Sequence, residues 1–487
     1  MIIIIHKKLQ ENIDWLNQEL GIDQSVDVVL REFEIGGRKA ALLFVDGFVD
    51  DTVATIIMTS LISVDREEIV PNTLAKILSS HVPYVDVETV DTLEESVHQC
   101  LAGPMVLFID GEQEAIKIDS RIYPARQPEE PDVEKVTRGS RDGFVETMMF
   151  NIALVRRRLR DPKLRAEVSR VGKRSAADVA LLYIDDITAT ELVDNVRRRI
   201  EDIDVDALPM AEKTVEEFMR RKYWNPFPEV RYTERPDVAA VHLLEGHVVI
   251  IVDNSPSVII APTTIFHHIH HAEEYRHDPV VGLYIRWVRL IGILLSFLLV
   301  PVWLLLALEP DLLPPALDFI GTEEDYTIPL LLQFVFAHIG IDLLRMASIH
   351  TPSPLAVALG LVGALLIGEI AVEVGFFVPE VLLYMGLVAV GIFSTPSWEL
   401  GMANRLVLLF LTLTTGIFRL PGLLVGLALV FLRLVTTKSF GHSYLWPLWP
   451  FSGRELLNVM IRRPVPNQRF RPEFLQTKDK RRTGPRK

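Results

Sequence analysis

The hydrophobic pattern of the chain changes at about residue 290. Residues 290–308 read LIGILLSFLLVPVWLLLAL and contain no charged side chain. At a rise of about 1.5 Å per residue, this run forms roughly 28 Å of helix, which is close to the hydrocarbon thickness of a bilayer. The pattern therefore predicts a water-soluble head followed by membrane spans. We expect these spans near 287–308, 328–348, 355–378 and 381–395, followed by a hydrophobic pair at 406–418 and 420–435.

The head contains two segments with the same order of apolar and polar residues. Residues 41–46 (ALLFVD) and 180–185 (ALLYID) are short apolar runs that end in Asp, and an amphipathic helical stretch follows each. Two later runs, 105–110 (MVLFID) and 248–253 (VVIIVD), each precede a loop and another strand-like run. Short runs rich in β-forming residues are typical of buried strands. The sequence predicts an α-helical polytopic transmembrane domain and an α/β cytoplasmic head of two related subdomains, at 1–130 and 175–265.

Composition places the remaining boundaries. Residues 124–136 are rich in Pro and Glu, which indicates a linker. The C-terminal tail carries ten Lys and Arg residues from Arg462 onward, and it is expected to be either solvated or in contact with anionic lipid headgroups. The remaining divisions are 131–174 (linker and basic helix), 266–289 (juxtamembrane coupling segment), 290–438 (transmembrane helical domain) and 439–487 (basic cytoplasmic tail).

Charge and cysteine content narrow the class of protein. The net charge of −14 argues against a nucleic-acid partner, because a phosphate-binding face needs concentrated Lys and Arg. Cys100 is the only cysteine, so no disulfide can form within the chain. A reducing compartment suits such a head.

The orientation follows from charges beside the spans. Arg286 and Arg289 flank the first span on the head side, whereas the loop after it carries six acidic residues between 309 and 325 and no Lys or Arg. The positive-inside rule then places the head and the tail in the cytoplasm. Both ends on one side require an even number of crossings. Four spans with a re-entrant pair and six spans both satisfy this condition.

We expect no enzymatic activity, no cofactor and no metal. Asp46, Asp110, Asp185 and Asp253 end the four apolar runs and could bind a metal or a nucleotide, but an Asp that caps or turns the chain after a strand is the favoured interpretation. The sequence contains no Gly-rich phosphate loop and no Cys/His pair with zinc spacing. The head is therefore interpreted as a binding or assembly module.

Ionisable and polar residues inside the spans are the candidates for an ion pathway. Glu369 and Glu373 are four residues apart and share one helix face, so in a multimer they would form rings of negative charge. A pair of carboxylates near the membrane surface is the alternative. Gln333 and His338 could line the same path. Asp342 and Arg345, three residues apart, are expected to form a local ion pair, with a gate as the alternative.

Several long motifs resemble one known family. Residues 139–164 (GSRDGFVETMMFNIALVRRRLRDPKL), 226–237 (PFPEVRYTERPD) and 244–253 (LEGHVVIIVD) are similar to the signature of the GerA-type spore germination A subunits. The resemblance covers nearly the whole chain. Residues 267–275 (HHIHHAEEY) and 443–451 (SYLWPLWPF) resemble a sporulation branch of the family rather than the nutrient-receptor A subunits.

The resemblance implies a multi-pass protein of the spore inner membrane that acts in germination. It implies a homo-oligomeric ion channel, with a pentamer as the expected form and a second membrane protein as the germinant-sensing partner. The sporulation branch is associated with amplified ion release. We therefore expect a channel subunit for monovalent cations. A non-conducting scaffold or receptor and a secondary transporter are the alternatives, and membrane lipid is the remaining partner.

A last group of residues is expected to serve subunit assembly or coupling of the head to the spans. The basic helix could dock an acidic surface of a neighbouring subunit or be solvated. Histidines before the first span could sense pH or bind a metal, but structural packing at the membrane surface is the favoured interpretation. These residues are Arg141, Asp142, Glu146, Arg156, Arg157, Arg158, Arg235, His267 and His271.

Overall fold

The structure is a computed structural model. It describes residues 3–482 except 83, 85, 123–133, 135, 221–222, 313–320, 323–325, 351–367 and 369, and for 348–350 only the backbone. The chain forms two compact units. The head unit comprises Met1–Tyr223, Val230–Pro262 and Val465–Lys487, and the membrane unit comprises Trp224–Glu229 and Thr263–Pro464.

The first half of the head unit is a five-stranded antiparallel sheet with helices on both faces. Its strand order is β1-β2-β4-β5-β3. The elements are α1 (Leu9–Leu20), β1 (Val28–Ile35), β2 (Arg38–Val45), α2 (Asp51–Ile62), α3 (Arg66–Ile69), α4 (Thr73–Lys76), a π-helical turn (Ile77–His81), β3 (Val87–Val90), α5 (Leu93–Leu101), β4 (Met105–Ile109) and β5 (Ala115–Ile118).

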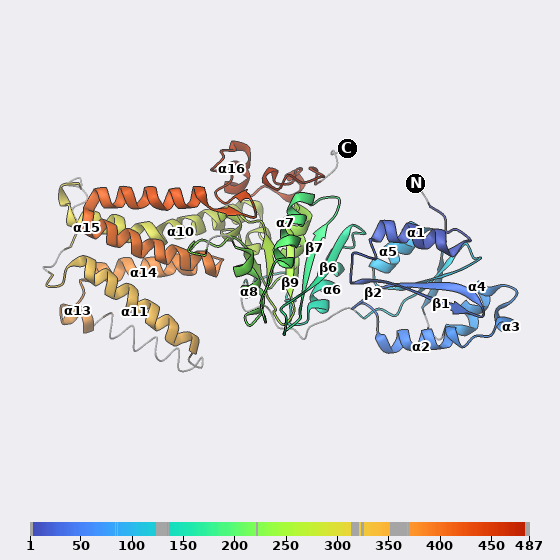
Figure 1. The fold of residues 1–487 in the computed structure, drawn as a ribbon. Helices are drawn as coiled ribbons and strands as arrows, with labels where there is room; N and C mark the ends of the chain where they lie inside the picture. Colours follow the sequence, from blue (N-terminus) through green and yellow to red (C-terminus); the bar gives the residue numbers. More distant parts are fainter. Residues whose placement is uncertain are drawn as a thin grey trace. The chain divides into compact units, whose positions relative to one another are not determined.

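The layers follow from the period of two along each strand. In β2, Ala41 and Leu43 pack with α1 and α5, whereas Ala40 and Leu42 face the opposite way and pack with α2. Figure 1 shows α1 and α5 on one face of the sheet and α2 on the other. Because β2 and β4 are covered on both faces, each contains a continuous apolar run.

The second half of the head unit repeats this fold. Its sheet order, β6-β7-β9-β10-β8, matches the first one strand for strand. The elements are α6 (Met148–Arg158), β6 (Leu164–Val171), β7 (Ala177–Ile184), α7 (Thr190–Glu201), α8 (Ala211–Met219), β8 (Arg231–Thr233), α9 (Pro236–Glu245), β9 (Val248–Val252) and β10 (Val258–Ala261). The predicted pair of related α/β subdomains is thus confirmed.

The predicted start of the second subdomain at residue 175 needs correction. Strand β6 pairs with β7 over its full length, and helix α6 packs on β9 and β7, so both belong to this subdomain and not to a linker. The apolar pattern missed β6 because it is an edge strand, LRAEVSRV, in which charged residues interrupt the apolar ones.

The two repeats also share their side-chain hydrogen bonds. Asn12 in α1 bonds the backbone N–H and C=O of His6, at 2.8 and 2.7 Å, and Asn151 in α6 bonds those of Val145 in the same way, at 2.8 and 2.5 Å. Asp110 accepts from the N–H of Leu9 at 3.0 Å, and Asp253 accepts from the N–H of Met148 at 3.1 Å. Both aspartates therefore bind helix N-termini, as the capping interpretation predicts.

The membrane unit contains 3₁₀ turns η2 (Ile265–His268), η3 (Ala272–Tyr275) and η4 (Pro310–Leu312), then helices α10 (Pro279–Leu308), α11 (Leu330–His350), α13 (Ala371–Glu373), α14 (Pro379–Phe393), α15 (Trp398–Thr436) and α16 (Gly453–Met460). Within the described residues, α10, α11 and α15 are long and apolar enough to cross a membrane, and α14 is a shorter apolar helix. Most of the predicted span at 355–378 lies outside the described residues.

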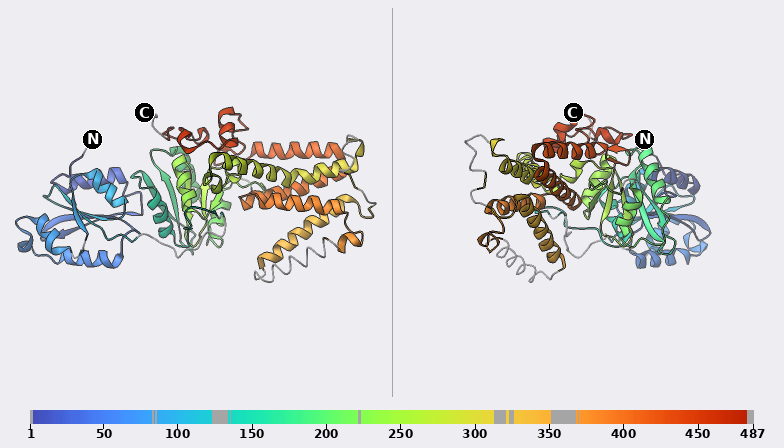
Figure 2. Two further views of the ribbon diagram at one scale, coloured as in Figure 1. Left: turned by 180° about the vertical axis from the view of Figure 1, so that it is seen from behind. Right: turned by 60° about the vertical axis from the view of Figure 1, so that its left-hand side comes forward.

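Helix α15 is a hairpin of two antiparallel arms. The backbone leaves the helical region at Arg419 (φ 57°, ψ −140°), just before Pro421. Figures 1 and 2 show the arms side by side, coloured from orange to red. A Cβ on Gly422 would lie 2.0 Å from the carbonyl oxygen of Thr414, and one on Gly426 would lie 2.8 Å from Leu411. Glycine thus permits the close approach of the arms. The two arms therefore form a hairpin and not a single kinked helix.

The end of the chain folds back onto the second subdomain. Within the head unit, Arg471 donates to the carbonyl oxygen of Leu244 at 2.8 Å, and Lys478 donates to that of Asp185 at 2.7 Å. Phe474 and Leu475 are buried. Residues 465–482 therefore form part of the head, which corrects the interpretation of this stretch as a solvated or lipid-bound tail.

Candidate functional site

The membrane unit holds a group of partly buried ionisable side chains between two helices. His338 and Asp342 lie four residues apart on α11 and so share one face. The carboxylate of Asp342 contacts the guanidinium of Arg405 from α15, and Nε2 of His338 lies 3.4 Å from the same carboxylate. Asp342 is eight residues from the end of α11 and Arg405 seven from the start of α15, so both are roughly 10–12 Å inside their helices.

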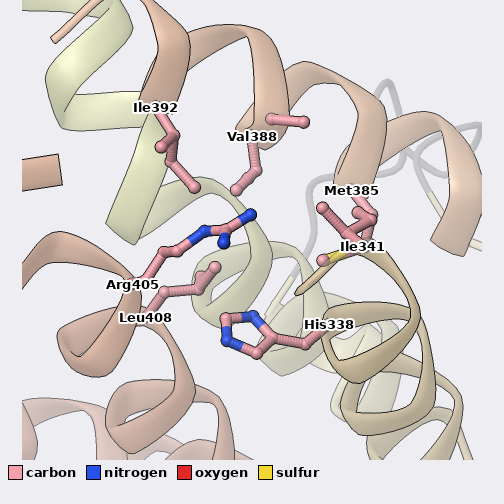
Figure 3. Close-up of a pocket in the computed structure, with 8 residues that line it drawn as sticks. His338, Ile341, Met385, Val388, Ile392, Arg405 and Leu408 are labelled. Carbon is pink, nitrogen blue, oxygen red and sulfur yellow. The ribbon is translucent and has the colours of Figure 1, made fainter. Parts of the chain in front are cut away.

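Arg405 is the most enclosed member of this group. Its side chain is 5% exposed, and its Nε lies buried with no hydrogen-bond partner among the described residues. Figure 3 shows the guanidinium and the imidazole of His338 reaching into one narrow pocket, whose other walls are apolar residues of α11, α14 and α15. An uncompensated charge in such surroundings is costly, so Asp342 and Arg405 stabilise each other only while α11 and α15 stay in contact.

The predicted pair between Asp342 and Arg345 needs correction. Asp342 pairs with Arg405 instead, 63 positions along the chain. The guanidinium of Arg345 lies 3.6 Å from the ring centroid of Trp398, and it contacts the sulfur of Met402 at 2.8 Å. Arg345 therefore contacts the start of α15, whereas Asp342 contacts Arg405 farther along the same helix. Both residues join α11 to α15.

Of the other predicted pathway residues that the structure describes, Gln333 and Glu373 do not lie at this site. Gln333 is buried, and its amide accepts from the N–H of Val378 and donates to the carbonyl oxygen of Ile328, both at 2.8 Å. It joins α11 to the start of α14. Glu373 is exposed at the end of α13, and Glu369 lies outside the described residues.

A second ionic cluster joins the coupling segment to the first span. Glu274 in η3 is fully buried and contacts Arg289 and Arg286 of α10, the latter at 2.7 Å. Arg286 also donates to the carbonyl oxygen of Val459 in α16 at 2.7 Å. Arg286 and Arg289, the two arginines on which the predicted membrane orientation rests, therefore hold η3, α10 and α16 together. The acidic partner was missed because Glu274 lies in a polar run that reads as exposed.

The basic helix is held within the chain. Both oxygens of Asp27 accept from Arg156, at 2.7 and 3.1 Å, and both side chains are buried. Arg158 pairs with Asp142, and Nη2 of Arg158 donates to Ser140 at 2.8 Å. The prediction that this helix docks a neighbouring subunit is therefore wrong for Arg156, which instead ties α6 to the first subdomain. Arg157, Arg141 and Glu146 are exposed.

Arg235 has the same kind of role. It is fully buried, binds both oxygens of Asp237 at 2.9 and 3.1 Å, and donates to the carbonyl oxygen of Ser140 at 3.0 Å. Because Ser140 begins the motif at 139–164, Arg235 fastens that motif to α9. The assignment of Arg235 to subunit assembly is corrected to a contact within the head.

The histidines before the first span make local hydrogen bonds. Nδ1 of His267 lies 2.8 Å from the hydroxyl of Thr264 in a capping box, and Nδ1 of His271 accepts from the N–H of Glu273 at 3.2 Å. These contacts agree with the structural interpretation of the cluster.

The comparisons place this architecture among known proteins. Residues 14–474 match the family described as Bacillus/Clostridium GerA spore germination protein. The chain belongs to the GerA family. This GerA-family chain is 46% identical over 98% of its length to stage V sporulation protein AF of Bacillus subtilis (strain 168), covering 97% of that protein. It is 31% identical to spore germination protein GerLA of Bacillus cereus, over 95% of each chain.

The first of these relatives, stage V sporulation protein AF, belongs to the sporulation branch that the motifs at 267–275 and 443–451 indicated. The head of this GerA-family chain also resembles a solved structure, the N-terminal domain of the A subunit of the Bacillus megaterium spore germinant receptor GerK3. That match has 29% sequence identity and a TM-score of 0.43, and it covers 54% of this chain and 97% of the other.

Proposed function

We propose that this spore germination protein is a channel-forming subunit that conducts ions, namely monovalent cations, across the spore inner membrane during germination. The observation that carries the proposal is the Asp342–Arg405 ion pair between α11 and α15, in which Arg405 is buried and Asp342 is partly exposed. Charged side chains within spans are costly and are generally retained at ion or proton pathways. The names of the relatives support the germination role.

An even number of crossings is part of the proposal. What supports it is the path of the chain, which leaves the head unit after Pro262 and rejoins it at Val465. Everything between must begin and end on the same side of the membrane. The positive-inside rule makes that side the cytoplasm, or the core of the spore.

The pair also suggests how conduction would be gated. Separation of α11 from α15 would leave the buried guanidinium of Arg405 without its carboxylate partner, which is costly. The pair therefore favours one arrangement of the two helices. Glu369 and Glu373 stay the proposed selectivity residues, and a homo-oligomer with a second membrane subunit stays the proposed assembly.

Single-channel recording tests these proposals. The full chain would be reconstituted in a planar bilayer, with and without the second subunit, and its oligomeric state measured in the same preparation. We expect discrete cation currents. Asp342→Asn and Arg405→Gln should each change the open probability, and exchange of the two charges (Asp342→Arg with Arg405→Asp) should restore it in part. Glu373→Gln should change the ion selectivity. Glu217→Gln, at an exposed position of α8, should change neither the open probability nor the selectivity.

Other results would favour the alternatives. A folded, oligomeric sample that is silent in both conditions would point to a scaffold or receptor. Flux that saturates with a coupled substrate would point to a secondary transporter. Currents that the Asp342 and Arg405 variants leave unchanged would remove the pair from gating.

A further inference from the structure

The turn after α9 brings three metal-ligating side chains together inside the head unit. One ligand atom from each of His242, Glu245 and His247 lies within 4.8 Å of those of the other two. The cause is the helix end: Gly246 adopts φ 103°, and the N–H of His247 donates to the carbonyl oxygen of His242 at 3.1 Å. Glycine takes this left-handed conformation readily, so the chain reverses and His247 returns toward the helix.

The hydrogen bond of His242 fixes which nitrogen can bind a cation. Its Nδ1 lies 2.8 Å from the carbonyl oxygen of Val238, which can only accept, so Nδ1 carries the proton. The lone pair is then on Nε2. Ligand histidines usually donate their other ring N–H to a carbonyl or a carboxylate in this way.

The two arginines near these three residues each contact a carboxylate, so their charges are partly neutralised where a cation would bind. Arg482 donates to Oε1 of Glu245 at 3.1 Å, which leaves Oε2 of the same carboxylate for a metal. Arg231, the other cation close to His242, pairs with Glu134 at 2.6 Å. The ring of Phe474 from the C-terminal segment lies 5.8 Å from that of His247 and helps to cover the turn.

The first repeat shows that this turn does not need the three residues. Helix α5 and strand β4 correspond to α9 and β9, with Gly103 in the place of Gly246, and both glycines have positive φ. Counted from these glycines, His242, Glu245 and His247 correspond to Gln99, Ala102 and Pro104. The same connection therefore forms without any ligand. The polar triad is particular to the second repeat, which makes a binding role the better explanation.

We propose that His242, Glu245 and His247 bind a first-row divalent transition metal ion, with zinc as the best fit. Two imidazoles and one carboxylate form a borderline ligand set that suits Zn²⁺ and disfavours Ca²⁺ and Mg²⁺, which prefer oxygen ligands. The ion would fasten the end of α9 beside the docked C-terminal segment. The sequence pattern did not indicate this site because the two histidines, with four residues between them, have no Cys pair to complete a zinc-finger pattern. The proposal does not depend on conduction.

The test is zinc binding by the full chain, purified in detergent without a polyhistidine tag and stripped of metal. Titration against a chromophoric zinc chelator gives stoichiometry and affinity, and X-ray absorption at the zinc edge gives the ligands. We expect one tightly bound zinc per chain with nitrogen and oxygen ligands. His247→Gln and His242→Gln should each weaken binding at least about tenfold. His242→Gln copies Gln99 of the first repeat, so it is expected to fold.

His98→Gln, at an exposed position of α5, is the matched control and should bind zinc like the parent chain. Zinc should also raise the unfolding temperature of the parent but not that of His242→Gln. The proposal is overturned if no zinc binds in competition with the chelator, or if both variants, shown to be folded by circular dichroism, retain the parent affinity. In the second case the zinc would be held by the histidines before the first span.

Discussion

The buried Arg156–Asp27 pair should control how readily the first subdomain opens. Both oxygens of Asp27 accept from Arg156, which also donates to the carbonyl oxygens of Asp161 and Leu164, at 3.0 and 3.1 Å. The side chains are 1% and 0% exposed. Nearby, the N–H of Val26 donates to the carbonyl oxygen of Ala166 at 3.0 Å. The pair is thus the charged centre of the contact between the two repeats.

The magnitude follows from burial. Removal of one partner leaves an uncompensated buried charge, which typically costs about 3–5 kcal/mol. At about 1.4 kcal/mol for each factor of ten, the opening equilibrium should rise between roughly a hundredfold and a few thousandfold. We therefore expect a change of this size in Arg156→Met or Asp27→Asn, and a smaller loss in the double variant than the sum of the two.

Cys100 supplies the assay without any engineering. It is the only cysteine of the chain, it is fully buried, and it lies close enough to Arg156 and Asp27 to feel both charges. Burial raises the pKa of the Cys100 thiol to about 12, so at pH 8 the native thiol is protonated and unreactive. The rate of labelling by a thiol reagent then reports the population in which the subdomain is open.

Lys8→Met is the matched control, because the Lys8–Glu11 pair lies in the same subdomain but is mostly exposed. Such surface pairs contribute about 0–1 kcal/mol, so the labelling rate should change by less than about fivefold. Equal labelling rates in Arg156→Met and in the parent chain, both under conditions where closing is faster than labelling, would refute the assigned role of the pair.

The remaining predictions concern the thiol, the hairpin and the C-terminal segment. Because burial raises the pKa of Cys100, the contribution of the protonated thiol to stability is complete below about pH 9 and is lost as the pH rises toward 12. The loss is up to about 1.4 kcal/mol per pH unit. Urea unfolding at pH 8 and 10 should show this loss in the parent chain but not in Cys100→Ala. Gly422→Ala should destabilise the membrane unit by about 1–3 kcal/mol or more, because its Cβ would overlap Thr414, whereas Gly386→Ala, with no neighbour within 4 Å, should be neutral in thermal unfolding. Leu475→Ala, at a fully buried position, should cost about 2–5 kcal/mol of docking energy and expose residues 465–482 to limited proteolysis, whereas the exposed neighbour Lys480→Ala should not.

The sequence predicts best what local pattern determines. Strands β2, β4, β7 and β9 are buried on both faces over most of their length, so each contains an unbroken apolar run. Edge strands β1 and β6 were missed because their outward side chains are charged and leave only scattered apolar residues. The aspartates after β4 and β9 were correctly interpreted as caps, but the helices that they cap begin about a hundred residues earlier in the chain. Only the folded sheet brings them together.

The candidate site could be predicted only in part, because it is formed by contacts between residues that are far apart in the sequence. A charge inside a span is unusual, which makes Asp342 a candidate from the sequence alone. The basic residue nearest to it in the sequence, Arg345, is not its partner. Arg405 was missed because it directly precedes the predicted apolar stretch at 406–418 and so reads as a flanking residue. Helix α15 in fact begins seven residues earlier, which places Arg405 inside the membrane unit and opposite Asp342.

The duplicated head allows a comparison that a single sequence normally does not. Bonds present in both repeats, such as those of Asn12 and Asn151, belong to the shared fold, because each repeat needs them to begin its first helix. Features present in one repeat require another cause. Arg156 reaches out of the second repeat to Asp27 in the first, and the turn at Gly246 carries ligands where the turn at Gly103 has none. Function in this head is therefore best sought where the repeats differ, at the junction between them and at the end of α9.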